Sequence, residues 1–416
     1  MAEASRCLGC ADAPCIDGCP ARNNIVKFIR QIAQENFRGA IRTVKESNVF
    51  AGTCAYICPV GESCEMKCGS KLDRPVKIGE LQRFVAEYER ENGFRKFKTL
   101  PPKNKKIGVI GAGPAGLSAS FYLVCMGYEV EVFEAAELPG GILTYGIPEN
   151  RLIPDVVKDE IEFIVQMGAK IKINSPVDDL NKFIDHYDAI FIGVGAYGSV
   201  KLKIPGEELE EVIQAQNYLK RRKIAVYNNQ KPDIKLGSRV AVFGGGNTAI
   251  DAATCAKNDG SEDVKIYYRR SINDMPAFKD EIEYCKTLDI EIIEYMQPVS
   301  FQGENNKLKS VTIVKTKPGE VDQSGRQRPV MIEGSEFFIE IDSAIAAIGQ
   351  LPTFENTDIV DVDKKGLILI DDETMKTSHP KIFAGGDAVN GGATVVKAVA
   401  DGCKAAEGID ALIGKS

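Results

Sequence analysis

Hydrophobic positions divide this chain into a short helical part and a longer part in which strands and helices alternate. Between residues 24 and 47 apolar side chains recur at three- and four-residue steps, and the same spacing returns from Ile78 to Glu91. Such spacing predicts amphipathic helices. From residue 106 onward, short apolar runs alternate with longer helical stretches, which predicts an α/β fold.

A strand, a glycine-rich turn, a helix and a second strand follow one another between residues 106 and 134. The turn is Gly111-Ala112-Gly113-Pro114-Ala115-Gly116, and the second strand ends in Glu134. In a dinucleotide-binding turn the first glycine permits the tight bend, the second lets the backbone approach a pyrophosphate, and the third lets helix pack on strand. Glu134 is placed to accept hydrogen bonds from ribose hydroxyls. An ordinary glycine-rich turn in an unrelated α/β domain would not need this terminal acid.

The same plan returns between residues 239 and 270. Its turn is Gly244-Gly245-Gly246-Asn247-Thr248-Ala249, and its second strand ends in Arg269-Arg270. Two guanidinium groups at that position suit a 2′-phosphate, so the pattern favours NADPH over NADH. The alternative is a solvated pair of surface arginines. Two such repeats predict two dinucleotide-binding domains with parallel sheets.

Further segments indicate FAD at the first turn. Gly140-Gly141-Ile142 follows the first repeat, and near the C-terminus Gly385-Gly386-Asp387 follows a short apolar run. An aspartate after two glycines at a strand end can hydrogen-bond a ribityl chain. A helix then begins near Thr394, and its N-terminus could face an isoalloxazine ring.

Two similar apolar runs, 188–195 and 342–349, are expected where the chain leaves one dinucleotide domain and returns to it. The second domain is therefore predicted to be inserted in the first. The expected division is an α-helical domain over 1–103, a first part of the FAD domain over 104–198, an NADPH domain over 199–349 and the second part of the FAD domain over 350–416.

The net charge and the length of the apolar runs limit the classes of partner that we expect. The 416 residues carry a net charge of −7, so there is no global basic excess for nucleic acid. No apolar run reaches the roughly 20 residues of a membrane span, and the first residues do not form a signal peptide. We therefore expect neither nucleic acid nor membrane as a partner, and a cytoplasmic location.

Cysteines give the strongest chemical signal. Eight of the twelve lie in the first 68 residues, and two of these precede a proline. Cys-x2-Cys spacing followed by Cys-Pro is typical of iron–sulfur ligation, and cysteines in a reducing compartment serve metals more often than disulfides. A zinc-binding module with nucleotide-binding folds is the non-enzymatic alternative.

The other four cysteines, Cys125, Cys255, Cys285 and Cys403, are isolated, so no dithiol of a disulfide reductase is expected beside the flavin. The two histidines, His186 and His379, belong to no catalytic constellation. We predict no catalytic side chain, because bound cofactors would carry the chemistry.

From residue 1 to about 412 the chain resembles the small (β) subunit of NADPH-dependent glutamate synthase. It also resembles the N-terminal half of dihydropyrimidine dehydrogenase and the electron-input subunit of the bacterial form of that enzyme. The residues that carry the likeness are 3–10, 13–15, 18–20 and 78–84. The resemblance implies a helical iron–sulfur domain followed by two Rossmann-like domains of the glutathione/adrenodoxin reductase type.

The resemblance also implies two interleaved [4Fe–4S] clusters. One would be held by Cys7, Cys10, Cys15 and Cys68. The other would be held by Cys19, Cys58, Cys64 and Gln82, with Gln82 as a non-cysteine ligand. Cys54 is then left as a structural cysteine.

For FAD, the positions that match the family are Gly111, Gly113, Pro114, Ala115, Gly116, Glu134, Gly141, Ile142, Arg151, Gly386, Asp387 and Thr394. For NADPH they are Gly245, Gly246, Asn247, Thr248, Arg269, Arg270, Ala347 and Gly349. The implied activity is hydride transfer from NADPH to FAD, followed by single-electron transfer through the clusters. The acceptor would be a partner subunit carrying FMN and the substrate site. The alternative is a stand-alone reductase of ferredoxin, flavodoxin or a small oxidant.

Overall fold

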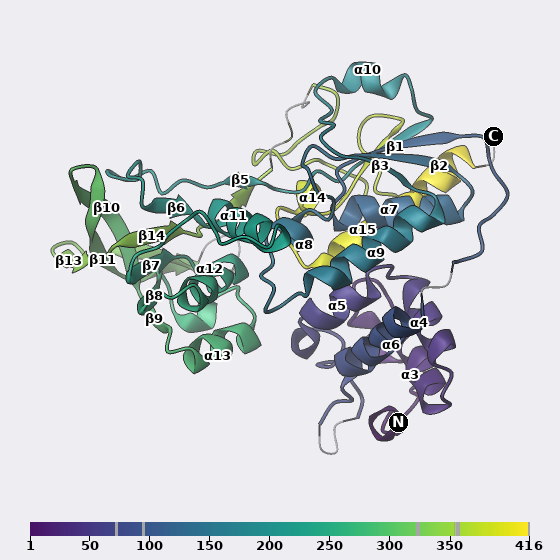
Figure 1. The fold of residues 1–416 in the computed structure, drawn as a ribbon, viewed down its shortest axis with the longest axis horizontal. Helices are drawn as coiled ribbons and strands as arrows, with labels where there is room; N and C mark the ends of the chain where they lie inside the picture. Colours follow the sequence, from purple (N-terminus) through teal and green to yellow (C-terminus); the bar gives the residue numbers. More distant parts are fainter. Residues whose placement is uncertain (71–73, 94–95, 322–324, 353, 355–357, 415–416) are drawn as a thin grey trace. The chain divides into compact units, whose positions relative to one another are not determined.

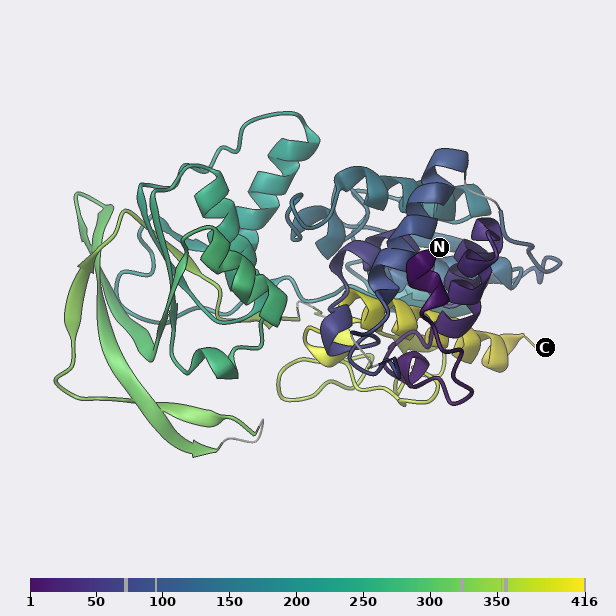
Figure 2. The ribbon, with the colours of Figure 1, turned by 90° about the horizontal axis from the view of Figure 1, so that it is seen from below.

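The computed structural model describes residues 1–70, 74–93, 96–321, 325–352, 354 and 358–414. This part of the chain forms two compact units (Figures 1 and 2). The first unit contains residues 1–144, 149–197 and 351–416, and the second contains 145–148 and 198–350. The second unit is thus inserted in the sequence of the first.

The N-terminal part of the first unit is helical. Its elements are α1 (Ala2–Ser5), α2 (Pro14–Asp17), α3 (Ile25–Ala33), α4 (Phe37–Lys45), α5 (Ala51–Ile57), the 3₁₀ helix η1 (Val60–Glu62) and α6 (Ile78–Asn92). Phe28, Ile32, Val44 and Val85 are fully buried between these helices, which explains the apolar spacing of the sequence.

The helical stretch 24–47 is broken into α3 and α4. Glu35 adopts a left-handed conformation with φ of +59°, and the side chain of Asn36 then accepts a hydrogen bond from Gly39 N at 3.0 Å as the N-cap of α4. Asparagine is a favoured capping residue. The second cysteine segment begins as a helix, because residues 51–57 form α5.

A parallel sheet forms the rest of the first unit. Its strands lie in the order β16-β4-β1-β2-β3, with bounds Ile382–Ala384, Ala189–Ile192, Lys106–Ile110, Glu129–Phe133 and Lys170–Lys172. The helices are α7 (Pro114–Cys125), α9 (Pro154–Met167), α10 (Leu180–Ile184), α14 (Asp387–Asn390) and α15 (Val395–Ile413), and α8 (Ile142–Tyr145) ends where the chain passes between the units. Figure 1 shows α7, α9 and α15 on the side of the sheet that faces α5 and α6.

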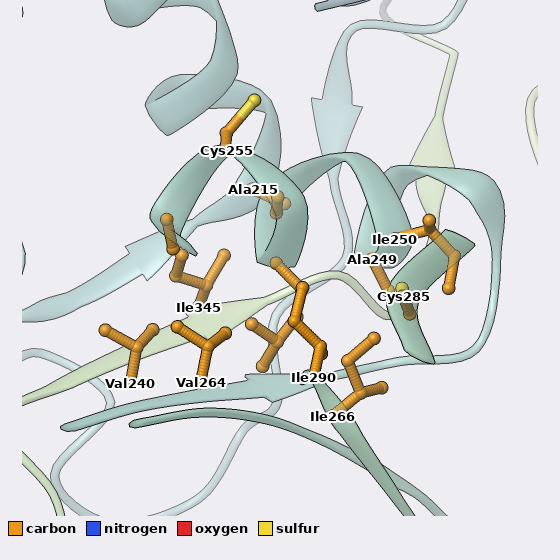
Figure 3. Close-up of a cluster of buried hydrophobic side chains, with 14 of the residues drawn as sticks. Ala215, Val240, Ala249, Ile250, Cys255, Val264, Ile266, Cys285, Ile290 and Ile345 are labelled. Carbon is orange, nitrogen blue, oxygen red and sulfur yellow. The ribbon is translucent and has the colours of Figure 1, made fainter. Parts of the chain in front are cut away.

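The second unit contains another parallel sheet. Its strands lie in the order β6-β14-β7-β8-β9, with bounds Val212–Gln214, Ser343–Ala346, Arg239–Phe243, Asp263–Tyr268 and Glu291–Glu294. Its helices are α11 (Ala215–Tyr227), α12 (Asn247–Asn258), α13 (Lys279–Thr287) and the 3₁₀ helix η2 (Ile272–Asp274). Figure 3 shows strand residues Val240, Val264 and Ile345 in one hydrophobic cluster with Ala249 and Ile250 of α12. The two parallel sheets confirm the predicted α/β fold.

An antiparallel sheet in the second unit was not expected. It consists of β10 (Met296–Glu304), β11 (Lys307–Val321), β12 (Gln327–Met331) and β13 (Phe337–Glu340). Phe301, Val311 and Ile313 from this sheet share a core with Phe243 of β7. The short strands β5 (Gly198–Ser199) and β15 (Gln350–Leu351) pair with each other at the crossings between the units.

Within the described part of the chain, no helix combines the length and hydropathy needed to cross a membrane.

Candidate cofactor and cluster sites

The first glycine turn has the geometry of a phosphate-binding turn. Gly111 has φ of +95°, and a Cβ there would lie 2.5 Å from the carbonyl oxygen of Gly193. A Cβ at Gly116 would lie 2.0 Å from the carbonyl oxygen of Gly111. At Gly113, by contrast, a Cβ would approach no described atom closer than 3.9 Å. The turn is therefore packed at its first and third glycines and open at the second, where a pyrophosphate would approach the N-terminus of α7.

Glu134 closes this turn from the next strand. Its carboxylate accepts hydrogen bonds from Ala112 N and Ala136 N, both at 2.8 Å. A carboxylate can accept about four hydrogen bonds, so it retains acceptor sites for ribose hydroxyls. The backbone bonds hold the carboxylate beside the turn, which is the position expected from the sequence.

The Gly140-Gly141 segment lies against the same turn. Gly140 N donates to Ala112 O at 2.7 Å, and Gly141 has φ of +55°. A Cβ at Gly141 would lie 2.9 Å from Gly113 Cα. Ile142 follows as the first residue of α8, and half-buried Arg151 lies in the turn before α9. The segment thus borders the open side of the phosphate turn.

The C-terminal FAD motif meets the turn from the other side. Gly386 has φ of +71°, and a Cβ there would lie 3.0 Å from Cβ of Ala115 in α7. Asp387 accepts a hydrogen bond from Ala393 N at 3.2 Å. Burial raises the pKa of its carboxyl group, and nearby Asp401 raises it further. Thr394 is the N-cap of α15 and accepts a hydrogen bond from Lys397 N at 3.4 Å.

Asp401 is a site residue that the sequence did not single out. Its buried carboxylate accepts a hydrogen bond from Gly386 N at 3.0 Å and pairs with Lys397. Helix α15 also packs closely on α7, because Gly402 would place a Cβ 2.2 Å from Ala115 O. Asp401 and Gly402 therefore hold the two halves of the FAD motif together.

The second glycine turn repeats this arrangement in the second unit. A Cβ at Gly244 would lie 2.2 Å from Ala347 O, and one at Gly245 would lie 2.3 Å from the ring of Tyr268. A Cβ at Gly246 would meet no described atom within 4 Å. Asn247 and Thr248 open α12, and Asn247 Oδ1 accepts a hydrogen bond from Phe278 N at 2.9 Å. The backbone is therefore open at Gly246, which is the N-cap residue of α12.

The two arginines after β8 differ in their surroundings. Arg269 is exposed, whereas Arg270 is 8% exposed and its Nε donates to Gln327 O of β12 at 2.8 Å. Gly349, with φ of +136°, is exposed just beyond β14, and Ala347 N donates to Phe243 O at 2.8 Å. Arg269 is therefore the better placed of the two to meet a phosphate from solvent.

The N-terminal cysteines form two groups. In the first group, burial raises the pKa of Cys15 to about 11, and Cys68 and Cys7 raise it further through their proximity. Cys10 belongs here as well, because a Cβ at Gly69 would lie 3.3 Å from its sulfur. The structure thus gathers the four cysteines that the resemblance assigns to one cluster.

The second group lines a single cavity that contains Cys19, Cys54, Cys58, Cys64 and Gln82. The pKa of Cys58 is raised by its hydrogen bond with Cys54, by burial, and by the thiols of Cys19 and Cys64. Burial, and then Cys19, raise the pKa of Cys64 to about 12. Clustered thiols with raised pKa values would release their protons on binding iron.

Cys54 and Gln82 compete for the fourth position of the second group. The buried Cys54 thiol lies 3.7 Å from Asn48 Oδ1 and donates to it. Gln82 Nε2 donates to Ala51 O at 2.7 Å, which leaves the amide oxygen of Gln82 as a potential ligand. Among the described residues no three histidine, cysteine or acidic side chains are arranged to hold one metal ion. A [4Fe–4S] cluster makes a different demand, because each ligand binds a separate iron atom.

Two family models match the chain in succession. Residues 1–94 match dihydropyrimidine dehydrogenase domain II, 4Fe-4S cluster. Residues 105–402 match the pyridine nucleotide-disulphide oxidoreductases. These matches confirm the predicted fold class and the predicted resemblance to dihydropyrimidine dehydrogenase.

Several curated relatives match nearly the whole chain. The NADP(+)-dependent formate dehydrogenase subunit beta of Moorella thermoacetica is 35% identical over 96% of this chain. The small chain of glutamate synthase [NADPH] from Escherichia coli (strain K12) is 32% identical over 98% of this chain and 90% of its own length. The NAD-dependent dihydropyrimidine dehydrogenase subunit PreT of Salmonella typhimurium is 35% identical over 98% of this chain and 92% of its own length. The chain spans only 59% of the Moorella protein.

Among solved structures, Mycobacterium tuberculosis FprA in complex with NADPH aligns with a TM-score of 0.63 at 16% identity, over 76% of this chain and 85% of FprA. This likeness shows the fold alone. The chain belongs to the pyridine nucleotide-disulphide oxidoreductase family and carries an N-terminal domain of the dihydropyrimidine dehydrogenase 4Fe-4S type.

Proposed function

We propose that this chain is an NADPH-dependent flavin and iron–sulfur oxidoreductase that supplies electrons to another protein. The observation that carries the proposal is the presence of both cysteine groups in the unit that contains the FAD-type turn. When bound, FAD would accept hydride from NADPH, and the clusters would pass on single electrons. The proposed domains are 1–103 for the clusters, 104–198 with 350–416 for FAD, and 199–349 for NADPH.

The FAD proposal is supported by the open backbone at Gly113. We assign the pyrophosphate to the turn from Gly111 to Gly116 and the ribose to Glu134. Gly141, Ile142 and Arg151 would border the cofactor on one side. Gly386, Asp387 and Thr394 would border it on the other. These side chains bind and orient, and none is assigned a proton transfer.

The NADPH proposal is supported by the open backbone at Gly246. Gly245, Gly246, Asn247 and Thr248 would cradle the pyrophosphate. Arg269 would pair with the 2′-phosphate, and Arg270, which is bonded to Gln327 O of β12, would support the same group. Ala347 and Gly349 would border the dinucleotide at the end of β14.

For the clusters, we assign one to the first group, with Cys7, Cys10, Cys15 and Cys68 as ligands. The other is assigned to the second group, with Cys19, Cys58, Cys64 and the amide oxygen of Gln82. Cys54 remains a structural thiol in this proposal, and its thiol donates a hydrogen bond to Asn48 Oδ1.

The acceptor is proposed to be a separate protein or subunit. The relatives named as subunits of glutamate synthase, dihydropyrimidine dehydrogenase and formate dehydrogenase support an electron-input role. A partner with FMN and the substrate site, or a small electron carrier, would fit that role.

Composition of the purified protein tests this proposal. Anaerobically prepared protein should be brown and contain one FAD and about eight iron and eight sulfide per chain, as two [4Fe–4S] clusters require. A colourless protein that contains zinc and no flavin would refute it.

A further inference from the structure

Helix α5, which leads to the second cysteine group, is capped by a distant carboxylate. Its N-cap residue is Phe50, which has no polar side chain to satisfy the first backbone N–H groups. Glu160 of α9 takes that role. Its carboxylate accepts hydrogen bonds from Gly52 N at 2.6 Å, Thr53 N at 3.0 Å and Thr53 Oγ1 at 2.7 Å. Figure 1 shows α9 beside α5.

The capped segment is directly connected to the cluster cavity. Cys54 follows Thr53 in the chain, and Cys58 is the C-cap of α5. On the other side, Ala51 O accepts the hydrogen bond from Gln82. The position of α5 therefore determines where Cys58 and Gln82 stand relative to Cys19 and Cys64.

The contact leaves little freedom for movement. A Cβ at Gly52 would lie 3.1 Å from Glu160 Oε1 and 3.1 Å from Val156 Cγ1, so α5 approaches α9 through a glycine. Glu160 is 2% exposed. A buried carboxylate is stable only when it is hydrogen-bonded and compensated by charge, and here three donors provide the hydrogen bonds.

Buried charges surround this contact. Lys45 of α4 is 1% exposed, its Nζ lies 2.6 Å from Glu89 Oε2 of α6, and it sits 4.1 Å from the centre of the Phe163 ring of α9. Burial raises the pKa of Glu160, while Lys45 and the three hydrogen bonds oppose that effect. Lys45 thus pairs with Glu89 of α6, and its charge also acts on Glu160 of α9.

We infer that Glu160 is a positioning residue through which the flavin-binding domain fixes α5 and thereby sets the reduction potential of the cluster in the second cysteine group. The inference rests on the proposed function. Hydrogen bonding and the orientation of ligands are known determinants of cluster potential. A contact that only stabilises the fold would leave that potential unchanged.

The test compares Glu160→Gln with Glu162→Gln in the full-length protein with both clusters and FAD bound. Glu162 lies on the same helix but is exposed, so this control removes the same charge without touching α5. Redox titration followed by electron paramagnetic resonance should show one cluster shifted in Glu160→Gln by a tenfold change in its reduction equilibrium, about 59 mV for one electron. The other cluster and the control should match the unmodified protein.

A second variant covers the case in which Glu160→Gln loses its cluster. Thr53→Val removes only the hydroxyl donor and should shift the same cluster in the same direction by a smaller amount. Unchanged potentials in variants that retain full iron would overturn the inference, as would equal shifts in the control. If the unmodified protein contains no clusters, the proposed function fails instead, so the two failures are distinguishable.

Discussion

At the scale of single residues, Arg269 and Arg270 are adjacent in the chain but differ in their exposure to solvent. The glycines of both turns could be assigned because a missing Cβ has one geometric use there. The arginine pair was predicted as two equivalent groups. The structure distinguishes them, because Arg270 is buried and bonded to β12 whereas Arg269 is exposed. A local sequence pattern does not indicate which distant strand will contact a side chain.

This difference predicts unequal effects on NADPH binding. Arg269→Ala should raise KM for NADPH by about 10- to 100-fold, as expected for the loss of a charge-assisted pair with phosphate, while KM for NADH stays the same. Steady-state kinetics with an artificial acceptor would measure both. Equal increases for the two nucleotides would show that Arg269 does not contact the 2′-phosphate.

Arg270→Ala is the matched comparison. Because Arg270 is buried and bonded to Gln327 O, its loss should reduce stability by about 1–3 kcal/mol through an unsatisfied backbone group. Thermal unfolding should then show a lower Tm than in Arg269→Ala.

The proposed fourth ligand of the proposed second cluster gives another residue-level prediction. Gln82→Ala should reduce the iron content by as much as one cluster or alter the resonance of that cluster, because it removes a proposed ligand. Cys54→Ser should retain about eight iron atoms per chain. Iron analysis of both variants decides between Gln82 and Cys54 as the ligand. Loss of iron from Cys54→Ser alone would show that Cys54 is the ligand.

At the scale of elements, the glycine-bounded strands and helices were predictable and the long-range pairings were not. Strands β1 and β7 follow from short apolar runs before glycine turns. The break between α3 and α4 was missed because the apolar spacing continues across Glu35, whose left-handed backbone has no sequence signal of its own. The sheet from β10 to β13 depends on pairing between separate segments, and the cap on α5 comes from a residue 108 positions away.

Helix packing in the FAD domain gives a prediction at this scale. Gly402→Ala would force a methyl group against Ala115 O, 2.2 Å away, and so push α15 from α7. We expect a loss of about 1–3 kcal/mol in the free energy of unfolding and weaker retention of FAD. Glu407→Ala, at an exposed position of the same helix, is the control and should change neither quantity. Denaturant unfolding and flavin analysis would detect the difference.

At the scale of the whole molecule, the order of parts along the chain supports an electron path. The cysteine groups and the FAD-type turn belong to one unit, and the NADPH-type turn belongs to the unit inserted within it. The helical domain and both dinucleotide folds were predictable because each has its own sequence pattern. The acceptor was not, since its identity depends on a partner surface that no motif of this chain encodes.

The most direct measurement is an anaerobic titration with NADPH, followed by visible absorption and electron paramagnetic resonance. The account predicts bleaching of the flavin band together with the appearance of reduced-cluster signals, without any added mediator. Flavin reduction with clusters that stay oxidised, although dithionite reduces them, would contradict the proposed transfer from FAD to the clusters. Failure of NADPH to reduce the bound flavin at all would contradict the central claim.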